Sequence, residues 1–168
     1  TNFPSEGLYV QARGFTKNSF NKHSVDVLAY QVKADTFTPM TPKISFLSSA
    51  SFGKMRGTNM PINEYFKIGG FHPFRNSVVF VGMPVYSVLA KEYWTVGAGL
   101  QYHIFDNFSL LGRYNYMQYY DLHNHQNSLS GFGAGIGFDT FMGPILFSVG
   151  RTRKYHAPIF EITFGYHF

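Results

Sequence analysis

A chain of 168 residues with 19 Phe, 12 Tyr and no Cys cannot form a disulfide framework, a thiolate zinc site or a cysteine nucleophile. Its mean hydropathy is −0.11, and no run approaches the roughly 18 apolar residues that a spanning helix needs, which excludes a bundle of membrane helices. The net charge of +5 comes with no basic stripe or recognition motif, so we expect no nucleic-acid partner.

Residues 8–52 show the period of two that is typical of strands with one apolar face. Leu8, Val10 and Ala12 alternate with Gln11 and Arg13. A second apolar segment covers residues 24–37. In a third segment apolar residues alternate with serine: Ile44, Phe46, Ala50 and Phe52 against Ser45, Ser49 and Ser51. We therefore predict three strands before residue 56.

The same period is clearer after residue 92. Two segments place apolar residues on one face and polar residues or glycine on the other, namely 94–104 and 160–168. Three segments between them, 108–116, 131–139 and 145–150, alternate in a similar way. These five strands bring the predicted total to eight.

The connections between the predicted strands alternate in length. Short ones cover residues 37–42, 105–108 and 140–144, whereas longer and more polar ones cover 17–23, 55–91, 118–127 and 151–158. This alternation is typical of periplasmic turns and surface loops, and strands can cross hydrocarbon only in a closed barrel. We predict an all-β fold: a transmembrane antiparallel β-barrel in the bacterial outer membrane, with a periplasmic C-terminus.

Several short motifs resemble one family of outer-membrane barrels. Phe66-Lys67-Ile68-Gly69-Gly70-Phe71, followed by Pro73-Phe74-Arg75-Asn76, resembles the surface loop of the bacterial surface antigen superfamily, which includes barrel-assembly and two-partner secretion proteins. In that family Phe-x-x-Gly-Gly precedes an Arg-Gly-aromatic tip, whereas Asn76 follows the arginine here. Phe80-Val81-Gly82, residues 97–102 and Gly143-Pro144-Ile145 are similar to the barrel of patatin-like phospholipases of the Bacteroidetes type.

The resemblance implies that residues 1–168 are the C-terminal half of a sixteen-stranded barrel. It also implies that the long surface loop over 55–91 folds into the lumen, shaped by Gly69, Gly70, Phe71 and Arg75. The implied function is to anchor an N-terminal passenger, patatin-like or related, and to export or insert it. This chain would then not be an enzyme, although a missing N-terminal domain would be a patatin-like lipase. Residues 1–7 show no signal peptide, so we expect a mature form or the later part of a longer precursor.

Two other functions are compatible with an outer-membrane barrel. A complete eight-stranded barrel would act as an adhesin, a structural protein or a subunit of an outer-membrane complex with a protein partner. Its interior would be filled by side chains, so residues 55–91 would have to lie outside it. An outer-membrane lipase is the third hypothesis. The chain has no G-x-S-x-G elbow and no spacing that places Ser, His and Asp together, so we expect no catalytic residue and no cofactor.

Three groups of residues remain as candidates for function or for metal binding. Phe164, Tyr166 and Phe168 resemble the C-terminal signal that the barrel-assembly machinery reads during biogenesis. Arg151, Arg153 and Lys154, placed in the final surface loop, would meet the phosphates of lipopolysaccharide among the outer-membrane lipids; the alternative is a solvated loop. Asp121, His123 and His125 have donors suited to a metal, but a polar surface loop explains them better, and we expect no metal.

Four alternating glycines form a further motif: Gly131, Gly133, Gly135 and Gly137. They do not match the G-x-G-x-x-G pattern of a phosphate-binding loop. Because they share one strand face, we expect them to make room for an inserted loop.

Overall fold

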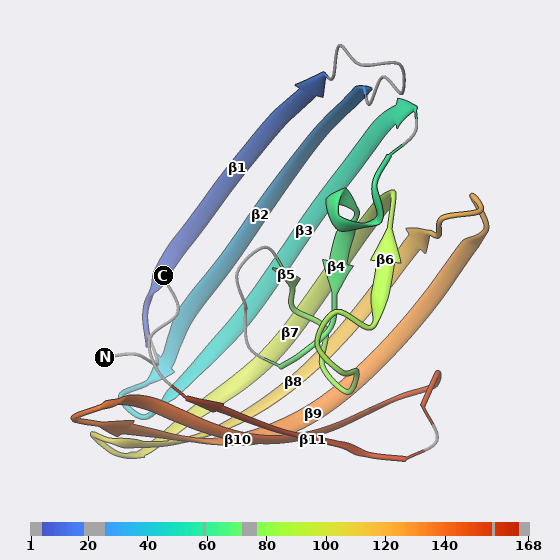
Figure 1. Ribbon diagram of the computed structural model, residues 1–168. Coiled ribbons are helices and arrows are strands. Elements are labelled where there is room, and N and C mark those ends of the chain that lie inside the picture. The colour runs from blue at the N-terminus through green and yellow to red at the C-terminus, as the bar shows by residue number, and fades with distance from the viewer. Residues whose placement is uncertain (1–4, 19–25, 59, 72–76, 156, 165–168) are drawn as a thin grey trace.

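The computed structural model describes residues 5–18, 26–58, 60–71, 77–155 and 157–164. Eight long strands form one antiparallel sheet in the order β1-β2-β3-β7-β8-β9-β10-β11 (Figure 1). Their bounds are β1 (Gly7–Asn18), β2 (Asp26–Thr41), β3 (Ile44–Thr58), β7 (Glu92–Phe105), β8 (Phe108–Tyr120), β9 (Gln126–Thr140), β10 (Gly143–Thr152) and β11 (Ile159–Phe164). No helix in these ranges is long and apolar enough to cross a bilayer. The predicted all-β fold with eight long strands is confirmed.

A second, three-stranded sheet lies between β3 and β7 along the chain and was not predicted. It contains β4 (Phe66–Ile68), β5 (Ser77–Val78) and β6 (Val88–Ala90), in the order β5-β4-β6. A single turn of 3-10 helix, η1 (Ile62–Glu64), precedes it. The connection between β3 and β7 therefore begins after Thr58, four residues later than the predicted start at residue 55, and has regular structure of its own.

Two-residue turns join three pairs of long strands. The turn residues are Pro42–Lys43, Asp106–Asn107 and Phe141–Met142. All three turns lie at one end of the sheet, at the lower left of Figure 1. We call this the turn end and the opposite end the loop end. The strand β2 reaches Thr41 rather than Phe37, because its pairing with β3 continues through Thr38 and Pro39 up to the turn.

Strand pairing aligns residues of one kind across the sheet. One row, on the convex face, is apolar or glycine: Phe46, Leu100, Gly112, Ala134, Val149 and Phe160. The adjacent row faces the other side and is mostly polar: Ser45, Gln101, Leu111, Gly135, Ser148 and Glu161. Such alternation suits a wall with lipid on one side and polar space on the other.

Aromatic pairs flank the apolar surface of the convex face. Near the turn end the rings of Phe108 and Phe138 are 4.8 Å apart, and toward the loop end those of Trp94 and Tyr116 are 5.5 Å apart. Phe108 and Tyr116 are eight residues apart on β8, which corresponds to about 20 Å along the membrane normal for a tilted strand. This height is close to the apolar band of outer-membrane barrels, which is about 25 Å tall.

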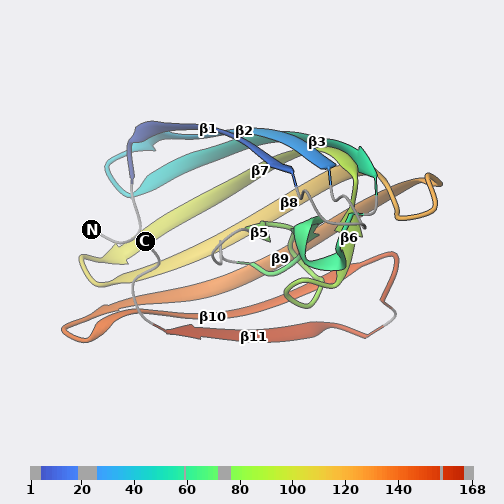
Figure 2. The ribbon, with the colours of Figure 1, turned by 45° about the horizontal axis from the view of Figure 1, so that its top comes forward.

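The sheet is strongly curved but not closed. Figure 2 shows that the small sheet and η1 lie on the concave side of the curved sheet. β1 and β11 are the two edges of the sheet, and no pairing links them in the described part of the chain.

Candidate functional site

The segment between β3 and β7 covers the concave face of the sheet, and we call its described residues, 60–71 and 77–91, the docked segment. Its chain reverses at glycines with positive φ, among them Gly69 at 135° and Gly70 at 92°. The N–H of Gly70 donates to Met83 O, and that of Phe80 donates to Gly70 O, both at 3.0 Å. These bonds hold the small sheet together where it meets the wall.

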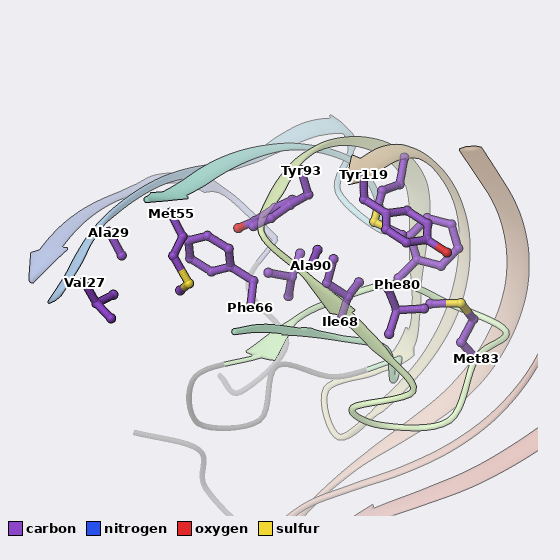
Figure 3. Packing of buried hydrophobic residues seen from close by; sticks show 13 residues of the cluster. Val27, Ala29, Met55, Phe66, Ile68, Phe80, Met83, Ala90, Tyr93 and Tyr119 are labelled. Carbon is purple, nitrogen blue, oxygen red and sulfur yellow. The ribbon is translucent and has the colours of Figure 1, made fainter. Parts of the chain in front are cut away.

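An apolar cluster joins the docked segment to β2, β3, β7 and β8. The segment contributes Phe66, Ile68, Val78, Phe80, Met83, Val88 and Ala90, and the wall contributes Val27, Ala29, Met55, Tyr93, Met117 and Tyr119. In Figure 3 Phe66 lies beside Met55 and Tyr93, and its ring meets that of Tyr93 edge-on at 5.1 Å. Burial of this apolar surface supplies the main attraction between segment and wall.

Tyr93 also has polar partners beneath the cluster. Gln31 Nε2 donates to the Tyr93 hydroxyl at 2.6 Å, and that hydroxyl shares a hydrogen bond of 2.9 Å with Ser51. A Cβ at Gly53 would lie 2.5 Å from the Tyr93 ring. Gly53 on β3 therefore leaves space for the Tyr93 ring. In this position the hydroxyl of Tyr93 bonds to the polar side chains of the sheet and its ring packs on the docked segment.

Glycines of β9 and β10 receive the other side of the docked segment. A Cβ at Gly131 would overlap Val81 O, and one at Gly133 would lie 3.3 Å from the Phe71 ring. A Cβ at Gly150 would lie 2.7 Å from Gly82 N. The expectation that these alternating glycines make room for an inserted loop is confirmed for Gly131 and Gly133.

Two polar contacts tie the docked segment to the outer strands of the sheet. The N–H of Phe71 donates to Glu161 Oε2 on β11 at 3.1 Å. Lys17 Nζ on β1 lies 2.7 Å from Glu64 Oε1 at η1. Because Glu161 is half-buried whereas Lys17 is exposed, the first contact is the stronger of the two.

The concave face toward the turn end carries charged and polar side chains. Lys33 Nζ lies 2.8 Å from Asp35 Oδ2, and Arg113 Nη2 donates to Ser49 Oγ at 2.9 Å. His103 shares hydrogen bonds with Gln101 and with Ser109, at 2.8 and 2.9 Å. Such a polar inner wall is typical of outer-membrane barrels.

The loop between β8 and β9 is organised by Asp121. Its Oδ1 accepts from the N–H of His125 at 2.9 Å and from that of His123 at 2.8 Å. These hydrogen bonds hold the pKa of the Asp121 carboxyl below its usual range. Within the described ranges no three His, Cys, Asp or Glu side chains come together in a way that could hold a metal.

The residues predicted from the sequence fall in three places. Gly69, Gly70 and Phe71 lie in the docked segment, whereas Arg75, Tyr166 and Phe168 lie outside the described residues. Phe164 is the last residue of β11 and points to the convex face with 64% of its surface exposed. Arg151 was placed in the final loop, which is wrong. It lies on β10, paired with Phe132, because the ladder continues to Thr152.

The contact of Glu161 with Phe71 and the contact of Gly82 with β10 were not predicted. The available signals were a lone carboxylate in an otherwise uncharged final strand and a glycine after Phe80-Val81, but neither identifies its partner.

The sequence was also compared with known protein families and with curated proteins. A family model described as the OMP85 superfamily matches residues 1–168. No curated protein matches the chain.

Proposed function

Because this chain belongs to the OMP85 superfamily of bacterial outer-membrane β-barrels, we propose that its sheet anchors an N-terminal passenger and that the docked segment controls a route through the barrel. The observation that carries the proposal is the position of the segment. It packs on β2, β3, β7 and β8 through the apolar cluster and on β9 and β10 through glycines. A segment held in this way blocks the space beside the wall, and its displacement would open that space.

The open edges support a barrel with more than these eight strands. β1 and β11 each present an edge that no other described strand pairs with. In hydrocarbon, unpaired backbone groups cost several kcal/mol each. Eight further strands, as the sequence resemblance implies, would cover both edges and leave a lumen wide enough for the docked segment. An eight-stranded barrel would leave room only for side chains.

Conductance across planar bilayers tests the control of the route. In a full-length variant, a short Gly/Ser linker would replace residues 60–88, which is feasible because Lys54 and Glu92 are already paired across β3 and β7. We expect the wild type to conduct poorly and the variant several times better, with Ile62→Ala as the control because Ile62 is 60% exposed. Equal conductance of wild type and variant, both shown to be folded by heat-modifiable migration, would contradict the proposal.

The intact mass of the denatured polypeptide from native outer membranes tests the passenger. A mass several times the 19.1 kDa of residues 1–168 is expected, and the preceding sequence would then show whether the passenger is patatin-like. A polypeptide near 19.1 kDa would contradict the anchoring of a passenger and leave the small-barrel function, with partner chains at the sheet edges.

A further inference from the structure

The convex face carries Arg151 at its loop end, beside an aromatic surface, and Arg153 follows directly after the end of β10. Tyr114, Phe132 and Arg151 are paired in one row across β8, β9 and β10. Tyr114 and Phe132 are 51% and 62% exposed. Arg151 ends the apolar series of β10 that begins with Ile145, Phe147 and Val149 on the same face.

A hollow lies at this position and is bordered by cations, hydroxyls and rings. Its volume is about 240 Å³, and its lining includes Tyr114, Ser130, Phe132, Arg151, Arg153 and Tyr155. Two guanidinium groups beside hydroxyl groups match the oxygens of a phosphate, since arginine binds phosphate through paired charge-assisted hydrogen bonds. The exposed ring of Phe132 offers an apolar surface to an acyl chain.

The two arginines have no partner in the described part of the chain. No hydrogen bond or ion pair involves the guanidinium of Arg151 or of Arg153 there. By contrast, Lys54 on the same face is paired with Glu92 at 2.6 Å. Exposed cations that face lipid without a counter-ion are costly unless they reach an anionic headgroup.

The height of Arg151 places it near the headgroups. It lies eight residues beyond Gly143 at the turn end, which is about 20 Å along the normal for a tilted strand, near the far boundary of an apolar band of about 25 Å. An arginine side chain is long enough to reach the boundary from this position.

The docked segment holds this part of β10 from the concave side. Gly82, with φ of 77°, packs so closely on β10 that an added Cβ would overlap the backbone N, C and O of Arg151. The docked segment therefore packs on the backbone of Arg151 from the concave side, while the side chain of Arg151 lies on the convex face.

We propose that Arg151 and Arg153 bind a phosphate group of a phosphorylated glycolipid in the outer leaflet, with its acyl chain on Phe132. Lys154, which sits over the Tyr155 ring at 5.8 Å, does not line the hollow. The proposal rests on the proposed membrane-spanning sheet and on the orientation predicted from the sequence, in which the loop end faces outside. The binding test below is made in detergent, where orientation plays no part, so the two can fail separately.

Native mass spectrometry of the full-length protein in detergent tests the site. The probes are diphosphorylated lipid A, its dephosphorylated form, phosphatidylcholine and inorganic phosphate. We expect diphosphorylated lipid A to bind the wild type at least about tenfold more tightly than the other three. Joint Arg151→Gln and Arg153→Gln substitution should remove this preference, and joint substitution by Lys should restore part of it. The control is Arg56→Gln, because Arg56 is exposed on β3 at the same end but does not line the hollow.

Three results would overturn the proposal. The first is equal lipid A binding by the wild type and the double Gln variant, with both folded by heat-modifiable migration. The second is an equal loss in the Arg56 control, which would show a general charge effect. The third is an affinity for inorganic phosphate equal to that for diphosphorylated lipid A, which would show that the acyl chain contributes nothing.

Discussion

At the scale of single residues, glycine decides where the docked segment can approach the wall. Gly82 contacts β10 where Gly150 and the backbone of Arg151 lie, and neither side has a Cβ between them. Backbone-to-backbone contact at this distance excludes any side chain, and the φ of 77° at Gly82 is also strained for other residues. The contact is therefore sensitive to one methyl group.

Gly82→Ala should weaken docking by about 3 kcal/mol, because it adds both overlap with β10 and backbone strain. Hydrogen exchange of the amides of residues 69–71 and 77–83 measures the effect, and their protection should fall. Gly112→Ala is the matched control, since a Cβ at Gly112 would meet no atom within 4 Å. Unchanged protection in Gly82→Ala would show that the contact between Gly82 and β10 has room for a Cβ.

Glu161 is the residue through which β11 holds the docked segment. Glu161→Ala removes a charged acceptor and should cost about 2 kcal/mol, which corresponds to roughly thirtyfold faster exchange of the Phe71 amide. Glu161→Gln keeps an oxygen acceptor and should lose less. Glu92→Gln breaks only the partly exposed pair with Lys54 and should cost less than about 1 kcal/mol. Equal exchange of Phe71 in the wild type and Glu161→Ala would exclude this role.

Sequence reasoning reached some of these residues but not their partners. Gly69, Gly70 and Phe71 were found through a motif, and the glycines of β9 through their alternation on one face. Glu161 and Gly82 are 79 positions apart from one another along the chain and act on different elements. Their contacts follow from the path of the docked segment, which no local pattern in the sequence specifies.

At the scale of elements, the molecule combines a regular wall with an irregular segment. The wall strands are long and alternate strictly, so each residue's face follows from its position. The docked segment has strands of only two or three residues and depends on the apolar cluster. It can therefore detach while the wall remains paired, since stability is not uniform across a structure.

Phe66→Ala tests this separation. Loss of the ring from the cluster should weaken docking by about 3 kcal/mol and raise exchange of the Phe80 amide on the order of a hundredfold. Amides of β8 in the wall should keep their protection. Ile62→Ala in η1 is the control, because Ile62 is mostly exposed. Joint loss of protection in β8 and the segment would show one cooperative unit instead.

The long strands could be predicted because a period of two persists over six or more residues in each of them. The small sheet could not. β4 and β5 are parallel and joined through residues 69–76, and β4 and β6 pair across a longer connection. Strands of this length contain too few residues to show a period, and their pairing depends on packing against Tyr93 and its neighbours.

At the scale of the whole molecule, the two ends of the sheet differ in chemistry. The turn end has two-residue turns and exposed apolar tips, with Phe141 at 94% and Met142 at 73% exposure. The loop end has longer connections, and its Arg151 and Arg153 have no partner among the described residues. This asymmetry agrees with periplasmic turns and outward loops, and it was visible in the sequence as alternating connection lengths. The open edges of the sheet could not be seen in the strand pattern, because alternation within a strand does not show which strands pair to close a barrel.

Cysteine labelling at the two ends of β9 tests the central claim, that this sheet crosses the outer membrane with its loop end outside. The 168 residues contain no Cys, so His123→Cys in the loop and Met142→Cys in the turn each add one thiol to this domain. A membrane-impermeant maleimide on intact cells should label the first variant and should label the second only after the outer membrane is permeabilised. Labelling of Met142→Cys but not His123→Cys in intact cells would reverse the orientation, and equal labelling of both would contradict a membrane-spanning wall.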